Sequence, residues 1–499
     1  MLSRKLSHFL PVFVVAGALG LAGCGGDSGA SSSLDEALGY LPEDAGFALV
    51  ASTDLDDYGD FQDLAEKFPF ADRATDALKQ SLERGDIDFD EQIKPLLGNE
   101  VVIGTSDNTS FLDDESDTPF VLAVETEDAD KLQDLAESGG GQKTGESEGY
   151  DLYETEDQTY LATKDEVLVL SNDQATLDDA LKQRGEDDRL TEDDVEPAFE
   201  DLPEDAPLRA YVNVRALLAA SPEAEDALKV EWVDHIETFG LSLDADDDAL
   251  AFDWSLQTDA EGLTDEDLPL ASGTEAPQLL AREEGSAELV LGVRDPSQVI
   301  DFALGTAKVV DPAGYAEFES GKEAIGKQLK IDVDEDVLAQ LTGNVAAVVS
   351  IDGDFGARAE LADADAFEGT LAKIMDGLPR FADGVTVTQP KQGSNFYGVA
   401  DQDGDSFAVG IADDALVVAN TAQLAADVAT RGLVDAEGQD GAFVASADAE
   451  QLVNAALAKF RGGLAGLTGG LVTGPLGELS QSVESSTDGL SGHLELNID

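Results

Sequence analysis

The feature that most constrains the fold of this chain is an internal repeat of short sequence motifs. Residues 87–91 and 97–99 (IDFDE and LGN) recur as residues 331–335 and 341–344 (IDVDE and LTGN). Four further patterns recur in the same order: 120–135 as 355–371, 153–172 as 397–420, 210–212 as 442–444, and 252–256 as 490–496. Because each pattern alone is weak but their common order is not, the sequence predicts a tandem duplication.

The repeat predicts the domain boundaries. Residues 38–258 form the first copy and residues 285–499 the second. Residues 259–284 are polar and carry Pro269 and Pro277, which indicates an acidic linker or a loose crossing strand. Residues 24–37 begin with a Gly/Ser-rich stretch and are predicted to be a flexible tether.

The same element order is expected in both copies. Opening strands are predicted at 47–51 and 287–291, each followed by a long helical stretch, which in the first copy has apolar residues at three- to four-residue spacing: Leu64, Phe68, Ala74, Leu78 and Leu82. Strands at 101–103 and 345–351 come next, and in the first copy a helix at 129–137 and short strands near Leu152, Tyr160 and Val167 follow. Strands joined by short turns pair antiparallel. We therefore expect an α+β fold with two tandem homologous domains, each an antiparallel sheet with helices packed on one face.

The N-terminus has the layout of a lipoprotein signal peptide over residues 1–23. Arg4 and Lys5 form a positive region, residues 9–21 form an apolar region, and Leu21-Ala22-Gly23-Cys24 has the pattern of a lipobox. Cleavage would leave Cys24, the single cysteine, as the first residue. Cys24 is therefore the predicted lipidation site, and acyl chains such as palmitate would anchor the protein to a membrane.

The charge of the chain excludes several partners. Asp and Glu total 106 against 29 Lys and Arg, for a formal net charge of −77. This field repels nucleic acid and anionic headgroups, so we expect no nucleic-acid partner and a membrane contact made through lipid. The acids are spread along the whole chain, which favours adaptation to salt over cation binding.

Asp401, Asp403 and Asp405 are the strongest metal-ligand candidates, because DQDGD matches the start of a calcium loop. The match fails later, where an EF-hand needs glycine and glutamate and this chain has Ser406 and Ala412. A hairpin turn between two strands explains the same residues. We therefore expect no metal site, with these three aspartates as weak candidates.

Catalytic chemistry is poorly represented. The three histidines are His8, His235 and His493, and neither of the last two lies in a recognisable motif. No phosphate-binding glycine loop or zinc-ligand set is present in the sequence. The expectation is a protein that is not an enzyme and needs no cofactor.

One segment departs from the repeat. Residues 456–477 are apolar and rich in glycine, where the first copy has the acidic residues 221–229. The segment is too short and too broken to span a bilayer. The favoured interpretation is an amphipathic helical hairpin packed on the sheet; the alternatives are a flap over an apolar groove or a segment resting on the lipid surface.

The lipobox, residues 41–45 (LPEDA) before the first strand, residues 97–99 (LGN) and the repeated strand–helix order resemble the DUF3352-type family of bacterial lipoproteins, a domain of unknown function. In the second copy the corresponding start is degraded to residues 284–287 (EGSA). The resemblance implies an exported, lipid-anchored protein and carries over no catalytic residues.

These observations predict a lipid-anchored lipoprotein on the extracytoplasmic face of the cell membrane, with a non-enzymatic binding or envelope-structural role. A second hypothesis is a carrier of an apolar ligand or lipid, in which each curved sheet encloses a continuous apolar cavity. An interaction module would instead have filled cores and an exposed apolar patch. A hydrolase is the third hypothesis.

Overall fold

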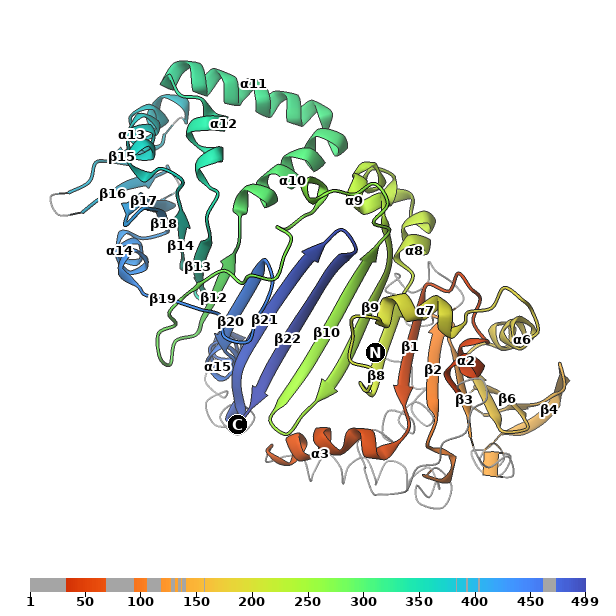
Figure 1. Ribbon diagram of the computed structural model, residues 1–499. Helices are drawn as coiled ribbons and strands as arrows, with labels where there is room; N and C mark the ends of the chain where they lie inside the picture. Colours follow the sequence, from red (N-terminus) through yellow and green to blue (C-terminus); the bar gives the residue numbers. More distant parts are fainter. Residues whose placement is uncertain are drawn as a thin grey trace. The chain divides into compact units, whose positions relative to one another are not determined.

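The computed structural model describes residues 33–68, 94–105, 118–126, 131–132, 136, 141–156, 158–382, 384–391, 394–402, 404–460 and 473–499 (Figure 1). The chain forms two compact units. Unit 1 comprises residues 1–225, 236–257 and 498–499, and unit 2 comprises residues 226–235 and 258–497. The domain boundaries drawn from the sequence repeat are close to this division, and they remain a prediction.

Unit 1 is built on one sheet whose described strands lie in the order β10-β9-β8-β1-β2-β3-β7-β6-β5-β4, with antiparallel pairing from β9 to β4. The strands are β1 (Phe47–Ser52), β2 (Glu100–Thr105), β3 (Val121–Glu125), β4 (Gln142–Ser147), β5 (Tyr150–Glu154), β6 (Tyr160–Lys164), β7 (Val167–Ser171), β8 (Leu208–Val212), β9 (Ile236–Ala245) and β10 (Ala249–Thr258). The helices are α2 (Ser33–Leu38), α3 (Gly59–Glu66), α6 (Gln174–Gln183), α7 (Glu192–Phe199) and α8 (Val214–Ala220).

In unit 2 the described strands lie in the order β22-β21-β20-β12-β13-β14-β18-β17-β16-β15, antiparallel from β21 to β15. The strands are β12 (Glu288–Val293), β13 (Val345–Ser350), β14 (Phe355–Glu360), β15 (Thr386–Thr388), β16 (Phe396–Ala400), β17 (Ser406–Ala412), β18 (Ala415–Ala419), β20 (Phe443–Asp448), β21 (Leu476–Ser486) and β22 (Gly489–Ile498). A small second sheet pairs β11 (Leu279–Leu280) with β19 (Leu433–Val434).

The helices of unit 2 are α9 (Glu231–Asp234), α10 (Pro296–Val310), α11 (Pro312–Leu329), α12 (Val333–Asp336), α13 (Ala364–Phe381), α14 (Ala422–Thr430) and α15 (Ala449–Phe460). The predicted long helical stretch after the second opening strand is confirmed as α10 and α11. In unit 1, Leu64 lies in α3, whereas Ala74, Leu78 and Leu82 lie outside the described residues.

The two sheets share one order of connections. β1 lies between β2 and β8, and β12 lies between β13 and β20. Each unit then has a four-strand antiparallel meander, β4 to β7 in unit 1 and β15 to β18 in unit 2. Its last strand pairs with the strand that precedes the meander in the chain: β7 with β3, and β18 with β14. The mixed α and β content and the antiparallel sheets were predicted correctly.

The expectation of helices on one face only is wrong. In unit 2, Val428 of α14 packs with Val417 on one face of the sheet, and Phe367 and Leu371 of α13 pack with Val409 on the other. Unit 1 likewise has separate buried clusters that contain alternating residues of β3, Ala123 and Leu122 among them. The physical reason is that the strands nearest these helices are almost continuously apolar, as in 415–419 (ALVVA), so both of their faces need cover.

The segment at 259–284 is ordered within unit 2. It contains a 3₁₀ turn (Asp265–Asp267) and β11, and Leu268 and Leu280 are fully buried. Arg294 donates hydrogen bonds to the carbonyls of Ala271, Ser272 and Gly273. Buried leucines and satisfied carbonyls hold this segment against the unit.

Candidate functional site

One face of the unit 1 sheet is apolar and incompletely covered. On this face, residues paired between β1, β8 and β9 form three rows that run across the strands: Phe47–Val212–Phe239, Leu49–Ala210–Leu241 and Ala51–Leu208–Leu243. None of these nine residues is fully buried, whereas Ala48, Val50 and Tyr211 on the opposite face are exposed by 2% or less. Residues paired across antiparallel strands share a face. We call these nine residues the apolar face of unit 1.

The rim of this face continues onto β10. The ring of Phe239 stacks on Trp254, with ring centroids 6.3 Å apart and an interplanar angle of 25°. The neighbouring residues Ser255 and Gln257 turn the other way and bond to Asp201. The alternation of a β-strand thus separates an aromatic edge from a polar one.

A second apolar surface lies on unit 2, on β12 and the two strands that correspond to β2 and β3 of unit 1. Three rows cross β12, β13 and β14: Leu289–Val349–Phe355, Leu291–Ala347–Ala357 and Val293–Val345–Ala359. None of the nine is fully buried, and Val349 and Phe355 are 39% and 44% exposed. Val290, Ala346 and Val348 on the opposite face are at most 4% exposed. We call these nine residues the apolar face of unit 2. Sequence reasoning missed both faces, because strands such as β1 (FALVAS) and β13 (VAAVVS) are apolar at almost every position and carry no alternation that tells one face from the other.

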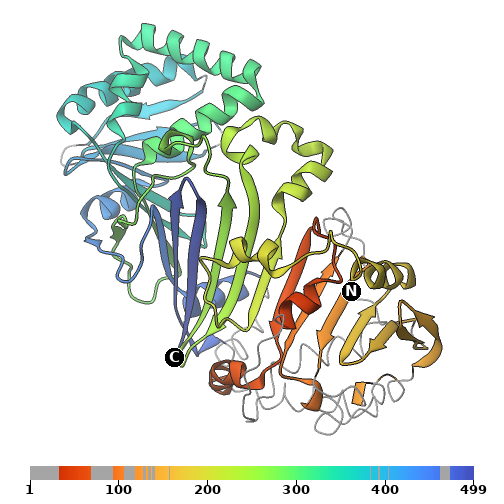
Figure 2. The ribbon, with the colours of Figure 1, turned by 45° about the vertical axis from the view of Figure 1, so that its right-hand side comes forward.

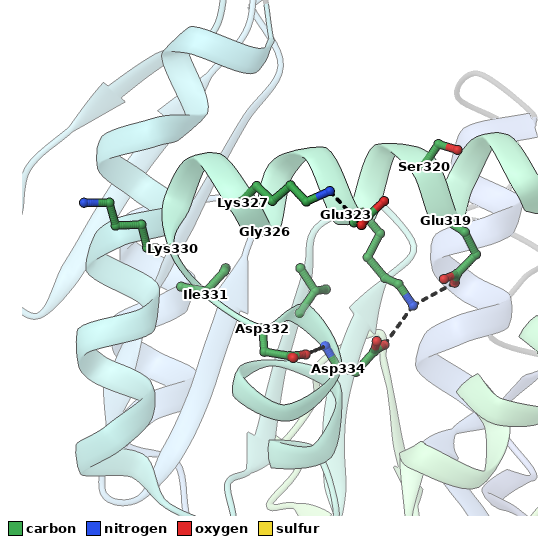
Figure 3. A pocket seen from close by; sticks show the side chains of 11 residues that line it. Glu319, Ser320, Glu323, Gly326, Lys327, Lys330, Ile331, Asp332 and Asp334 are labelled. Carbon is green, nitrogen blue, oxygen red and sulfur yellow. Dashed lines mark hydrogen bonds and ion pairs between the residues drawn. The ribbon is translucent and has the colours of Figure 1, made fainter.

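A charged pocket of about 570 Å³ lies between α11 and the segment that leads into α12 (Figure 3). The sequence folds this way because α11 ends at Lys330, whose left-handed backbone (φ 57°) turns the chain back, and Asp332 then caps α12 by accepting the N–H groups of Asp334 and Glu335. Lys322 Nζ bridges Glu319 (2.7 Å) and Asp334 (2.9 Å). Lys330 points away from the pocket.

The charges of this pocket compensate one another. The carboxylates of Glu319 and Asp334 raise the pKa of the Lys322 ammonium, and the Lys327 ammonium, 2.7 Å from Glu323, lowers the pKa of that carboxyl. Lys322 is therefore protonated at neutral pH and cannot act as a base or a nucleophile. The arrangement holds α11 to α12 and shows no catalytic geometry.

The predicted aspartate candidates lie at the turn between β16 and β17. Asp401 accepts hydrogen bonds from the N–H groups of Gly404 and Asp405, both at 2.9 Å. Asp403 lies outside the described residues. Asp401 thus uses one carboxylate oxygen to cap the turn, which is the structural role of an Asx-type residue.

Another carboxylate group, which the sequence did not single out, lies in unit 1. Asp60 and Asp63 of α3 and Asp247 of the β9–β10 turn place their oxygens within 4.8 Å of one another, and all three are exposed. Burial is the first cause of a raised pKa at nearby Asp244, with Asp60 as a further contributor. The distances admit a cation, but exposed acids are expected on a chain with 106 of them.

The two described histidines differ. His235 faces the backbone carbonyls of Glu231 (Nδ1···O 2.8 Å) and Glu261 (Nε2···O 3.2 Å). The Glu231 carbonyl is the first cause of a raised pKa of His235, and burial opposes it. His493 lies 3.7 Å from Glu495. Neither lies in the geometry of a nucleophile–base pair in the part of the chain that the structure describes.

Two predicted features lie outside the described residues. Cys24, with the signal peptide, is one, and most of the glycine-rich segment 456–477 (residues 461–472) is the other. None of the described helices combines the length and the apolar character needed to cross a membrane.

Three solved structures of the protein TP0453 are similar to this chain at low identity. Crystal form I is 14% identical, with 44% of this chain and 77% of that chain covered and a TM-score of 0.26. Crystal form III is 12% identical, with 46% of this chain and 81% of that chain covered and a TM-score of 0.25. Crystal form IV is 13% identical, with 44% of this chain and 79% of that chain covered and a TM-score of 0.25. At such TM-scores the likeness carries no argument. A comparison with curated proteins found no match.

A family model described as a protein of unknown function, DUF3352, matches residues 10–366. The match begins in the N-terminal region, spans the β1–β10 strands and extends through β14 of unit 2. It covers well over half of the chain, and it confirms the resemblance seen in the sequence. The chain belongs to the DUF3352 family of proteins of unknown function.

Proposed function

We propose that this protein is a non-enzymatic, lipid-anchored protein of the cell envelope that binds an apolar ligand on the apolar face of each unit. The observation that carries the proposal is the pair of incompletely covered apolar faces on β1, β8 and β9 and on β12, β13 and β14. Apolar surface left in contact with water costs about 25 cal/mol per Å², so contiguous apolar patches mark binding sites in soluble domains.

The ligand class follows from the chemistry of the two faces. Their paired rows consist of Val, Leu, Ala and Phe and offer no charged side chain within the rows. Such a surface favours an acyl chain or a similar apolar group over a polar metabolite. It is an open face and not the enclosed cavity expected of a carrier, so the ligand would lie along the strands. The alternative is that this protein is an interaction module, whose apolar faces bind an apolar surface of another envelope protein.

The anchor is the second part of the proposal. It is supported by residues 1–24, where a positive region, an apolar run and a lipobox place Cys24 at the new N-terminus. The membrane and the extracytoplasmic side follow from this pattern. Changing Cys24→Ala should move the protein from the membrane fraction to the soluble exported fraction. Wild-type protein without an acyl mass at Cys24 would contradict the anchor.

The two units are inferred to be copies of one fold. Their sheets have the same strand order, and the repeated motifs fall on corresponding strands: Tyr153 lies on β5 and Tyr397 on β16. The apolar faces share the opening strand, β1 or β12, and extend from it to β8 and β9 in unit 1 but to β13 and β14 in unit 2, so each unit offers one face of its own. A ligand should therefore bind with a stoichiometry of two.

The absence of catalysis is supported by the state of the described polar groups. The lysines of the α11–α12 pocket are ion-paired, and both ring nitrogens of His235 face backbone carbonyls. Groups used in this way are not free to accept a substrate proton.

Native mass spectrometry of gently extracted protein tests the ligand. We expect up to two bound apolar molecules of lipid mass, which are lost in Leu49→Asp and Val349→Asp variants, one for each unit. A ligand-free spectrum under conditions that keep a lipid on a control carrier would contradict the proposal. Capture of an apolar protein partner by the same faces would favour the alternative.

A further inference from the structure

The helical hairpin formed by α10 and α11 leaves its apolar side chains uncovered. These helices comprise residues 296–310 and 312–329, yet no apolar side chain of either is fully buried; Gly326 is the only buried residue of the hairpin. Four of the large apolar side chains that are more than a third exposed belong to it: Val309 (39%), Val310 (39%), Phe318 (48%) and Ile325 (39%). Figures 1 and 2 show α11 along the outer edge of unit 2.

The composition of α10 is unlike that of an ordinary surface helix. It carries one acid, Asp301, and one base, Lys308, in a chain with 106 acids. Its large apolar residues cover more than half of its circumference, and Ser297, Asp301 and Lys308 share the remaining side. So wide an apolar surface normally packs against a core or a membrane. In this structure α10 is half-exposed.

Specific contacts fix the first half of α10 to its own unit. Gln298 donates to the carbonyls of Asp265 (2.8 Å) and Leu268 (2.6 Å), and Phe302 meets the edge of Trp232 with ring centroids 6.2 Å apart. At the end of α10, Val309 and Val310 are exposed, and on α11 the exposed Phe318 and Ile325 lie two turns apart on one face of the helix. These contacts fix the position of α10, and with it the exposed side chains at its end.

Lysines accompany this surface. Lys308 lies beside Val309, and Lys322 Nζ is 5.9 Å from the centre of the Phe318 ring. Lys308 and Lys330 have no ion-pair partner among the described residues. Long lysine side chains can lie along apolar surface and place their ammonium groups at the level of phosphates.

We propose that the α10–α11 hairpin docks on the surface of a lipid bilayer, with Val309, Val310, Phe318 and Ile325 entering the headgroup–acyl boundary. This inference builds on the proposed lipid anchor, which would concentrate the chain at a bilayer. A bilayer is favoured over a second copy of the chain because two chains of net charge −77 repel each other, whereas a zwitterionic bilayer surface carries no net charge. Few unpaired charges accompany these side chains, because α10 has one carboxylate, and on α11 Glu319 and Glu323 are paired with Lys322 and Lys327.

Flotation with vesicles tests the inference. Full-length Cys24→Ala protein, which has no acyl anchor, is mixed with phosphatidylcholine vesicles. The hairpin variant Phe318→Ser/Ile325→Ser is compared with a matched control, Phe407→Ser/Val453→Ser, whose side chains lie elsewhere in unit 2 and are both 38% exposed. We expect the hairpin variant to lose about tenfold or more of its partitioning, and the control to stay within about twofold.

Two further measurements separate the explanations. A Phe318→Trp variant should be quenched by brominated lipid more strongly than the wild type, whose tryptophans are Trp232 and Trp254. Vesicles with added phosphatidylglycerol should bind less at low salt, because the whole chain is acidic, and recover in high salt. The inference is overturned if the wild type does not float, if both double variants lose binding equally, or if the wild type is a dimer that only the hairpin variant dissociates. Because no protein in this test is acylated, its failure leaves the Cys24 anchor to be judged by fractionation.

Discussion

Helices α13 and α10 of unit 2 are of similar length and are both rich in apolar residues, yet they bury very different fractions of them. In α13, Phe367, Leu371 and Met375 lie on one stripe and are at most 5% exposed. In α10, no side chain is buried. The comparison teaches that a narrow apolar stripe is covered completely by the sheet beneath it, whereas the wider apolar surface of α10 is covered only in part and leaves side chains for a further partner.

The first prediction concerns the loss of packing. Leu371→Ala in α13 should lower the free energy of unfolding by about 2–5 kcal/mol, because it opens a cavity among Phe367, Val399 and Val409. Ile325→Ala in α11, at a site that is 39% exposed, should cost less than about 1 kcal/mol. Chemical denaturation of both variants checks the contrast. Equal losses would mean that the hairpin is part of the core.

Replacing a glycine by alanine should change stability in opposite directions on the two helices. A side chain at Gly377 of α13 would meet Leu329 and Phe381, so Gly377→Ala should destabilise by about 1–2 kcal/mol. A side chain at Gly305 of α10 meets nothing within 4 Å, so Gly305→Ala should stabilise by up to about 1 kcal/mol through helix propensity. The melting temperatures of the two variants test this contrast. A lower melting temperature for Gly305→Ala would show that a partner already covers α10.

The ion pairs of α11 should contribute weakly. Lys322→Gln removes the contacts to Glu319 and Asp334, whose side chains are 37% and 61% exposed. We expect a loss of about 1 kcal/mol or less, reduced further in molar sodium chloride because surface pairs are screened. A larger loss of stability that salt does not change would mean that the Lys322 contacts stabilise the unit by more than a screened surface ion pair does.

The smallest effect is expected from His235, at the end of the segment that contacts α10. Its folded pKa is raised by the Glu231 carbonyl first, and by Glu261, Glu231 and Asp259. The stabilisation is therefore fully present below the unfolded pKa of about 6.5 and is lost as pH rises through the folded value. His235→Ala should remove this pH dependence of the melting temperature. A wild type that gains stability over the same rise in pH would contradict the sign.

Much of the fold could be predicted from the sequence. The opening strands, the α10–α11 stretch and the antiparallel pairing follow from periodicity and turn signals, and these are local properties. The cover on both faces could not be predicted, because it depends on which helix meets Val417 and which meets Val418 across the same strand. That choice is made by long-range packing.

The candidate site was less accessible from the sequence. The sequence directed attention to Asp401 and Asp405, and the structure places them in a turn. The apolar faces depend on register: Leu49 opposes Ala210, and Leu291 opposes Ala347, pairings that no local pattern specifies. Incomplete burial of these rows is likewise a property of the assembled sheet.

The central claim, that the apolar face of each unit binds an acyl chain, is tested most directly by photo-crosslinking. A fatty acid carrying a diazirine near its terminal methyl group is bound to the purified protein, irradiated and mapped by peptide mass spectrometry. The account predicts crosslinks on β1, β8 and β9 and on β12, β13 and β14, competed by unlabelled fatty acid. Crosslinks confined to other surfaces, or labelling that unlabelled fatty acid does not reduce, would contradict it.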